Sequence, residues 1–322
     1  MILKNRSRII ASLVALAALA GRDAHADGFD ARLYRPSSEA NGIGTVDGAK
    51  APDFGVVAPS IGSDLSIAQV TLSQGSQSNS VIDARFVVEP QVSIGAGSGF
   101  GLFARAPLIA GDAGRDVNGA TLPGAGVLPP SLGVLVPILR NPLSDGRLAV
   151  RAEVAAPVGS MEEFRSDGQI TARGSLNYGG YWYRTYVVGF AGGQLAPIRG
   201  VGDAQIGRAI TGGGGLRYPL TRSLALFGSG EARFDVDLPQ QSSGLISLGV
   251  EASSGHSVFR LLGSAGIRDV IGTPRAMVSL AWSFDLSKPP SFVEAHPMEQ
   301  PPEPPTTIAQ TNAPATRPRA PL

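Results

Sequence analysis

The feature that most constrains this chain is a two-residue alternation of apolar and polar side chains. In the segment 147–157 every second residue is apolar, and Arg147, Arg151 and Glu153 occupy positions between them. Such alternation places apolar side chains on one face of a sheet and polar side chains on the other. Beyond the N-terminal segment, helical 3.6-residue periodicity is essentially missing. The sequence therefore predicts an all-β chain.

Twelve segments share the alternation, and most are about ten residues long, the length of a tilted strand that crosses a membrane. They are 53–69, 81–94, 100–109, 127–139, 147–157, 168–178, 181–191, 206–218, 223–234, 244–252, 257–268 and 275–284. No later segment has about 18 or more continuous apolar residues, which excludes membrane-spanning helices. We therefore predict an antiparallel transmembrane β-barrel of about 12 strands.

The connections between these segments differ in length on the two sides of the predicted barrel. The short set is 95–99, 140–146, 179–180, 219–222 and 253–256, and the mostly longer set is 70–80, 110–126, 158–167, 192–205, 235–243 and 269–274. Short turns on one side and long loops on the other are typical of outer-membrane barrels. A soluble sandwich would also alternate, but its buried face favours large residues, whereas here the apolar faces are rich in Gly and Ala. An even strand number places both termini with the short turns, in the periplasm.

The two ends of the chain differ from the middle. A basic start, a short apolar run and the sequence Ala24-His25-Ala26 have the layout of a secretory signal peptide. The last part is rich in proline and has no apolar periodicity, which predicts an extended, disordered periplasmic tail. The expected organisation is a signal peptide (1–26), a periplasmic lead-in (27–52), the barrel (53–284) and the tail (285–322).

The predicted location, the outer membrane, sets the expected partners. Outer-membrane lipid and lipopolysaccharide would surround the barrel. The final strand ends Ser279-Leu280-Ala281-Trp282-Ser283-Phe284, which resembles the signal read by the barrel-assembly machinery. Removal of the signal peptide would leave 23 basic and 25 acidic residues, and no basic surplus points to nucleic acid. The oligomeric state is left open.

The order of several short motifs resembles the N-terminal barrel of OmpA-type outer-membrane proteins of myxobacteria and related groups. The matching stretches are Phe29-Asp30 through Arg35-Pro36, Val46-Asp47-Gly48-Ala49, Gly200-Val201-Gly202-Asp203 and Gly272-Thr273-Pro274. In that family a linker leads to a C-terminal peptidoglycan-binding domain. Here no such pattern follows the Pro-rich segment, so the resemblance does not extend to a wall-anchoring role.

The polar face of the strands carries the candidate functional residues, which would line the interior. Ten are basic: Arg85, Arg105, Arg147, Arg151, Arg173, Arg184, Arg217, Arg233, Arg260 and Arg268. Five are acidic: Asp83, Glu89, Glu153, Glu231 and Glu251. Paired with one another, these groups would plug and stiffen the barrel; left open, the positive surplus would attract anions.

The sequence favours a passive channel for small solutes, among them anions. The alternative is a closed structural barrel without transport, and a distant third is an outer-membrane lipid hydrolase using Ser257 and His256. His256 lies in a short turn with no acid nearby in sequence, so we predict no catalytic residue. The chain has no Cys, and His is scarce, so neither a metal site nor a cofactor is expected.

Overall fold

The computed structural model describes residues 30–74, 77–116, 118–141, 145–201, 204–268 and 272–284. The expected signal peptide and the expected Pro-rich tail lie outside these described residues. Within them, no helix is long and apolar enough to cross a membrane.

The described residues form β-strands joined by turns and loops, with one short 3-10 helix, η1 (Pro239–Gln241). The strands are β1 (Val57–Gln74), β2 (Gln77–Gly97), β3 (Phe100–Arg105), β4 (Leu108–Gly114), β5 (Gly126–Val127), β6 (Ser131–Asn141), β7 (Gly146–Ala155), β8 (Thr171–Trp182), β9 (Thr185–Leu195), β10 (Arg199–Val201), β11 (Ala204–Ile206), β12 (Ala209–Pro219), β13 (Leu224–Asp235), β14 (Ser243–Ser254), β15 (Ser257–Gly266) and β16 (Ala276–Phe284).

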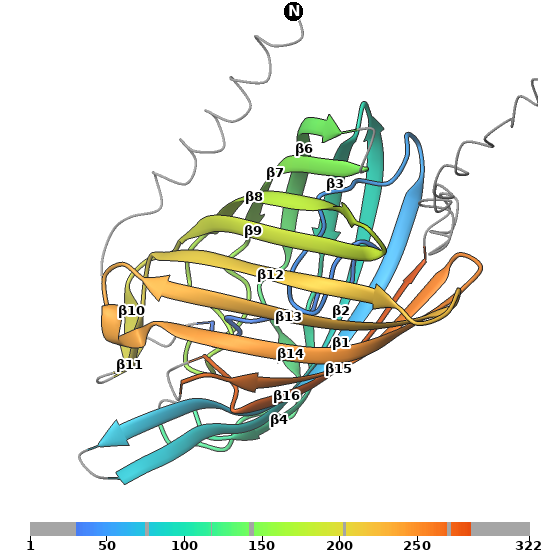
Figure 1. The fold of residues 1–322 in the computed structure, drawn as a ribbon. Coiled ribbons are helices and arrows are strands. Elements are labelled where there is room, and N and C mark those ends of the chain that lie inside the picture. The colour runs from blue at the N-terminus through green and yellow to red at the C-terminus, as the bar shows by residue number, and fades with distance from the viewer. Residues whose placement is uncertain are drawn as a thin grey trace, which may run out of the picture.

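The main sheet closes on itself, because β1 pairs with both β16 and β2 (Figure 1). β3 and β4 pair with successive parts of β2 and together occupy one position in the wall. β5 is a two-residue extension on β4, and β10–β11 form a separate hairpin. The wall therefore has twelve antiparallel positions, and the predicted fold class is confirmed.

The two ends of the barrel differ in their connections. Short turns join β2 to β3, β6 to β7, β8 to β9, β12 to β13, and β14 to β15. The opposite end carries the connections β4–β6, β7–β8, β9–β12, β13–β14 and β15–β16, together with the tip of the long β1–β2 hairpin. We refer to these as the short-turn end and the long-loop end.

The wall is apolar outside and polar inside. In β14 the side chains of Ile246, Leu248 and Val250 are exposed, and Leu248 is 70% exposed, whereas Ser247 and Glu251 at the alternate positions are buried. The same alternation runs through β15 and β16. An apolar outer band with a polar interior is the arrangement that lipid around a barrel requires.

Residues 30–53, which we call the plug, lie inside the barrel rather than outside it as the sequence analysis expects of a periplasmic lead-in. Much of this segment is buried, and it contacts inward residues on opposite sides of the wall. The Tyr34 hydroxyl is 2.7 Å from that of Ser243 in β14, and Asn177 in β8 donates to the Asp47 carbonyl. A segment without regular strands follows the shape of the wall, so its own sequence carries no periodic signal for this position.

The plug runs along the lumen from one end to the other. The Asp30 amide donates to Asp167 in the β7–β8 loop, at the long-loop end. At the other extreme the Gly55 amide donates to the carbonyl of Gly95, close to the β2–β3 turn. The last described residue, Phe284, lies at the short-turn end, whereas the first described residue, Asp30, lies at the long-loop end.

Candidate functional site

The barrel interior holds most of the fifteen residues that the sequence analysis singles out. Twelve lie on the inner face of the wall: Arg85, Glu89, Arg105, Arg147, Arg151, Glu153, Arg173, Arg217, Glu231, Arg233, Glu251 and Arg260. Three do not. Asp83 is exposed at a β-bulge in β2 that shifts the alternation, Arg184 is exposed in the β8–β9 turn, and Arg268 is exposed beyond the end of β15.

Arginine–carboxylate pairs tie the plug to the wall on one side of the lumen. Arg32 forms ion pairs with Asp64 of β1 and Glu89 of β2, and all three side chains are almost fully buried. Arg35 pairs with Glu153 of β7 at 2.7 Å. A buried pair is strongly destabilised when one partner is removed, since the other charge stays behind unpaired. These pairs therefore fix the plug in position.

A second group of contacts holds the middle of the plug. Glu39 pairs with Arg151 at 2.6 Å, and Asp47 pairs with Arg105 at 2.8 Å. The guanidinium of Arg260 donates to the backbone carbonyls of Glu39 and Ala40, each at 2.6 Å. The plug is thus held through its backbone as well as its side chains.

Several acids that sequence reasoning missed reduce the predicted arginine surplus. Asp64 and Asp112 belong to the wall, and Asp112 pairs with Arg85 at 2.8 Å. Glu39 and Asp47 come from the plug. The alternation of the first strand segment would have placed Asp64 inside, whereas nothing in the irregular sequence of 30–53 points to an interior position.

The β7–β8 loop (156–170) covers part of the long-loop end. Arg85 donates to the carbonyls of Phe164 and Glu163 at 2.9 and 3.0 Å. Arg165 donates to the carbonyls of Pro123 and Ala125 at 2.6 and 2.8 Å. The loop therefore contacts Arg85 of the wall and the β4–β6 connection.

The contact between this loop and the start of the plug involves two carboxyl groups. Burial, and next the charge of Asp30, raise the pKa of Asp167 to about 7. Burial also raises the pKa of Asp30 above its ordinary value. Desolvation and a nearby like charge both favour the neutral acid.

Three cavities follow one another along the plug. The cavity at the short-turn end has about 40 Å³, and its lining includes Ser60, Phe103 and Phe284. The middle cavity has about 80 Å³ and lies between the plug and β7, β8, β9, β12 and β13. The third has about 30 Å³ and reaches Asp167 at the long-loop end. Because one water needs roughly 10–15 Å³, each cavity holds only a few waters.

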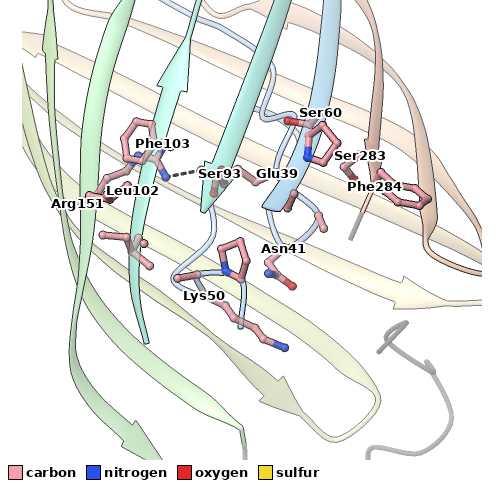
Figure 2. Close-up of a pocket in the computed structure, with 17 residues that line it drawn as sticks. Glu39, Asn41, Lys50, Ser60, Ser93, Leu102, Phe103, Arg151, Ser283 and Phe284 are labelled. Carbon is pink, nitrogen blue, oxygen red and sulfur yellow. Dashed lines mark hydrogen bonds and ion pairs between the residues drawn. The ribbon is translucent and has the colours of Figure 1, made fainter. Parts of the chain in front are cut away.

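Arg151 stands between the first two cavities and lines both. Figure 2 shows it at the inner wall with its ion pair to Glu39. Its guanidinium also lies over the ring of Phe103, 3.8 Å from the centroid. The middle and long-loop cavities adjoin more broadly, since Arg35, Glu153, Arg173 and Gln194 line both.

The remaining chemical candidates are a metal site and the side chain of His256. Among the described residues, no group of three or more His, Cys, Asp or Glu is arranged to hold a metal ion. His256 lies in the β14–β15 turn at the short-turn end, with its ring 5.9 Å from that of Phe284.

Comparison with known proteins gives a fold but no family. No protein-family model matches the chain, and no curated protein matches it. Among solved structures it is similar to an outer-membrane channel from Pseudomonas putida F1, with a TM-score of 0.55, 11% identity and coverage of 73% of this chain and 97% of that one. The NanC porin follows with a TM-score of 0.46, 7% identity, and coverage of 71% and 100%. OmpF of Salmonella typhi in complex with daunomycin has a TM-score of 0.32, 7% identity, and coverage of 71% and 96%. The first of these likenesses shows that the chain has the fold of an outer-membrane β-barrel, and the two with TM-scores below 0.5 add nothing to it.

Proposed function

We propose that this protein is a passive outer-membrane channel for small polar solutes, with the plug narrowing its lumen. The observation that carries the proposal is the row of three adjoining cavities beside the plug, which runs from the short-turn end to the long-loop end. A barrel of about eight strands is filled by its own side chains, whereas about 16–18 strands leave an open aqueous channel. A twelve-position wall lies between these limits, so the contents of the lumen decide what passes.

We place the gate of this path at Arg151. It separates the short-turn cavity from the middle cavity, and its contacts with Glu39 and Phe103 keep it across the route. Movement of this one side chain would join the two cavities. Solutes comparable in size to a few waters would pass, and larger ones would be excluded.

The strand sequence alone favours anions, but the charges of the lumen argue for a weak preference. Arg184, Arg268 and the acid Asp83 lie outside the interior. Asp64, Asp112, Glu39 and Asp47 add four negative charges to it, and Arg32 and Arg35 of the plug add two positive charges. Paired charges contribute little to the field that a passing ion meets. We therefore expect chloride to be favoured over potassium only slightly.

We assign the short-turn end to the periplasm and the long-loop end to the cell exterior, as is general for such barrels. Lipid would contact the apolar outer face, and lipopolysaccharide would meet the long-loop end, where Arg208 is 59% exposed on its side chain and pairs with Asp237. The barrel-assembly machinery would recognise the final strand. We also propose that the chain is related to the N-terminal barrels of OmpA-type outer-membrane proteins, which the sequence motifs resemble.

The closed structural barrel is the second candidate, and the plug is the observation that favours it. Its buried ion pairs would stiffen the wall as well as block it. A lipid hydrolase is the weakest candidate. His256 lies at the short-turn end, which we assign to the periplasm, away from the outer leaflet that such an enzyme would serve.

Conductance of the pure protein in a planar bilayer tests the proposal. The full chain should give small, discrete single-channel currents, and a variant lacking residues 31–52 should give currents several-fold larger, because the lumen then fills with water. Arg151→Gln should raise the current of the full chain less than the deletion does. Correctly folded samples in which neither the full chain nor the deletion conducts would leave the structural barrel as the better account.

A further inference from the structure

The middle cavity contains two charged side chains of opposite sign that form no ion pair with any described residue. Arg173 of β8 and Glu231 of β13 both line it. In the described part of the chain, neither side chain forms an ion pair, and the only hydrogen-bonding neighbour of Glu231 is the neutral hydroxyl of Thr45 in the plug. They reach the cavity from different strands and do not reach each other.

This absence of an oppositely charged partner sets the two residues apart from their neighbours in the same cavity. Arg35 pairs with Glu153 at 2.7 Å, and Arg151 pairs with Glu39 at 2.6 Å. Arg233 donates to Gln194 at 2.7 Å and to the carbonyl of Gly207 at 2.8 Å. Charged groups removed from bulk water are costly unless they are paired or solvated. Arg173 and Glu231 would therefore be stabilised by a polar ligand in the cavity that carries the opposite charges.

We propose that the middle cavity is a binding site for a small zwitterion of the amino-acid type. The carboxylate of the ligand would accept hydrogen bonds from Arg173, and its ammonium group would donate to Glu231. A lone anion would satisfy the guanidinium but leave Glu231 unpaired, and a lone cation would do the reverse. Only a ligand that carries both charges completes both groups.

The size and the remaining lining of the cavity fit such a ligand. Its volume of about 80 Å³ corresponds to several waters, at roughly 10–15 Å³ each. A zwitterion with five or six heavy atoms, such as glycine or alanine, has a similar bulk. Thr211 and Asn177 add neutral polar groups to the lining, and Phe190 and Leu33 add apolar surface for a small side chain. Large amino acids would not fit beside the plug.

This inference rests on the proposed channel function, since the solute must reach an interior cavity, and it names the solute class that the channel would favour. Passage requires binding that is favourable enough to enter and weak enough to leave. Two charged contacts favour binding of the ligand, and the loss of its hydration opposes binding. The net affinity would then be weak enough for the ligand to leave the cavity again.

Ligand-observed saturation-transfer NMR on the folded full chain in detergent tests the inference. The probes are alanine, propionate and ethylamine, of which the last two carry one charge each. Alanine should show transfer and the other two should not. Arg173→Gln and Glu231→Gln should each lower the apparent affinity for alanine at least about tenfold, the value of one charge-assisted hydrogen bond. Glu231→Asp should restore part of the loss, and Arg208→Gln, which alters an exposed arginine, should change nothing.

Two results would overturn the inference. Transfer to propionate equal to that to alanine would mean a simple anion site, and no transfer to any probe would mean that water alone fills the cavity. Both results are measured on the unmodified chain, so neither depends on whether a variant folds. Single-channel currents from the same sample separate the two proposals: currents without alanine binding remove only the zwitterion site, and alanine binding without currents removes only the channel.

Discussion

The plug makes different contacts with the two sides of the lumen. On the side of β1, β2 and β15, the plug is tied to the wall by Arg32 with its two carboxylates and by Arg260, which binds the plug backbone. On the side of β8, β9, β12 and β13, the plug contacts the wall through Asn177 and near Gly215, and the middle cavity lies between wall and plug with Arg173 and Glu231 in its lining. One side of the interior holds the plug, and the other side keeps a space beside it.

On this second side, small residues let the plug approach the wall closely at one place. The inward positions of β9 and β12 include Gly192, Gly213 and Gly215, which carry no side chain into the lumen. A Cβ on Gly215 would lie 2.9 Å from a methyl carbon of Ile43 in the plug. Glycine in a strand often marks a place where another segment approaches closely. The tied side instead carries long charged side chains that cross the gap to the plug.

The largest change in how the plug is held should come from removing the ion pairs of Arg32. Arg32→Met keeps much of the side-chain volume but leaves Asp64 and Glu89 buried without their cation, a change that costs about 3–5 kcal/mol. We expect the plug to detach, which limited proteolysis within 30–53 and larger single-channel currents would both report. Arg208→Gln is the matched control, because its ion pair is exposed, and it should leave both measurements unchanged. A plug that stays protected in Arg32→Met would show that the backbone contacts suffice to hold it.

A smaller effect should come from filling the space that glycine provides. Gly215→Val introduces a side chain against Ile43, and overpacking of this kind costs about 1–3 kcal/mol. We expect a lower unfolding temperature in detergent and faster hydrogen exchange around residue 43. Gly263→Val serves as the control, since a Cβ at Gly263 meets no atom within 4 Å. Equal behaviour of the two variants would argue against a close approach of plug and wall at β12.

The smallest effect should be a pH dependence at the long-loop end. The pKa of Asp167, raised to about 7 by burial and then by Asp30, means that the folded protein holds a proton there that the unfolded chain releases near pH 4. The folded state binds more protons between these values, so the stability of this contact is fully present at low pH and declines as the pH rises through about 7. Hydrogen exchange of residues 30–35 should therefore be slower at pH 5 than at pH 8.

Asp167→Asn removes the titrating group and should flatten this dependence. The amide can still accept the hydrogen bond from the Asp30 backbone through its oxygen. An unchanged pH profile in this variant would assign the effect to another group, with Asp30 the first to examine because its pKa is also raised.

The wall could be predicted from the sequence far better than the interior, and particular residues show why. The alternation through 147–157 placed Arg151 and Glu153 on the inner face, where the structure has them. It failed at Asp83, because a β-bulge between Ile82 and Ala84 breaks the alternation that would otherwise place Asp83 on the same face as Arg85. The partner of Arg151, Glu39, lies in a segment without periodicity whose path is set by tertiary contacts alone, so the sequence offered no sign of that pair.

The course of the plug has a consequence for the order in which the protein assembles. Tyr34 meets Ser243, 209 residues later in the chain, and the carbonyl of Glu39 meets Arg260, 221 residues later. Contacts between such distant residues form slowly, because a long loop must close before they repay its entropy. The first folded residues of the chain are thus among the last to reach their final environment. The contacts with Ser243 and Arg260 can form only when β14 and β15 are in place, so capture of the N-terminal segment belongs to the last stage of folding.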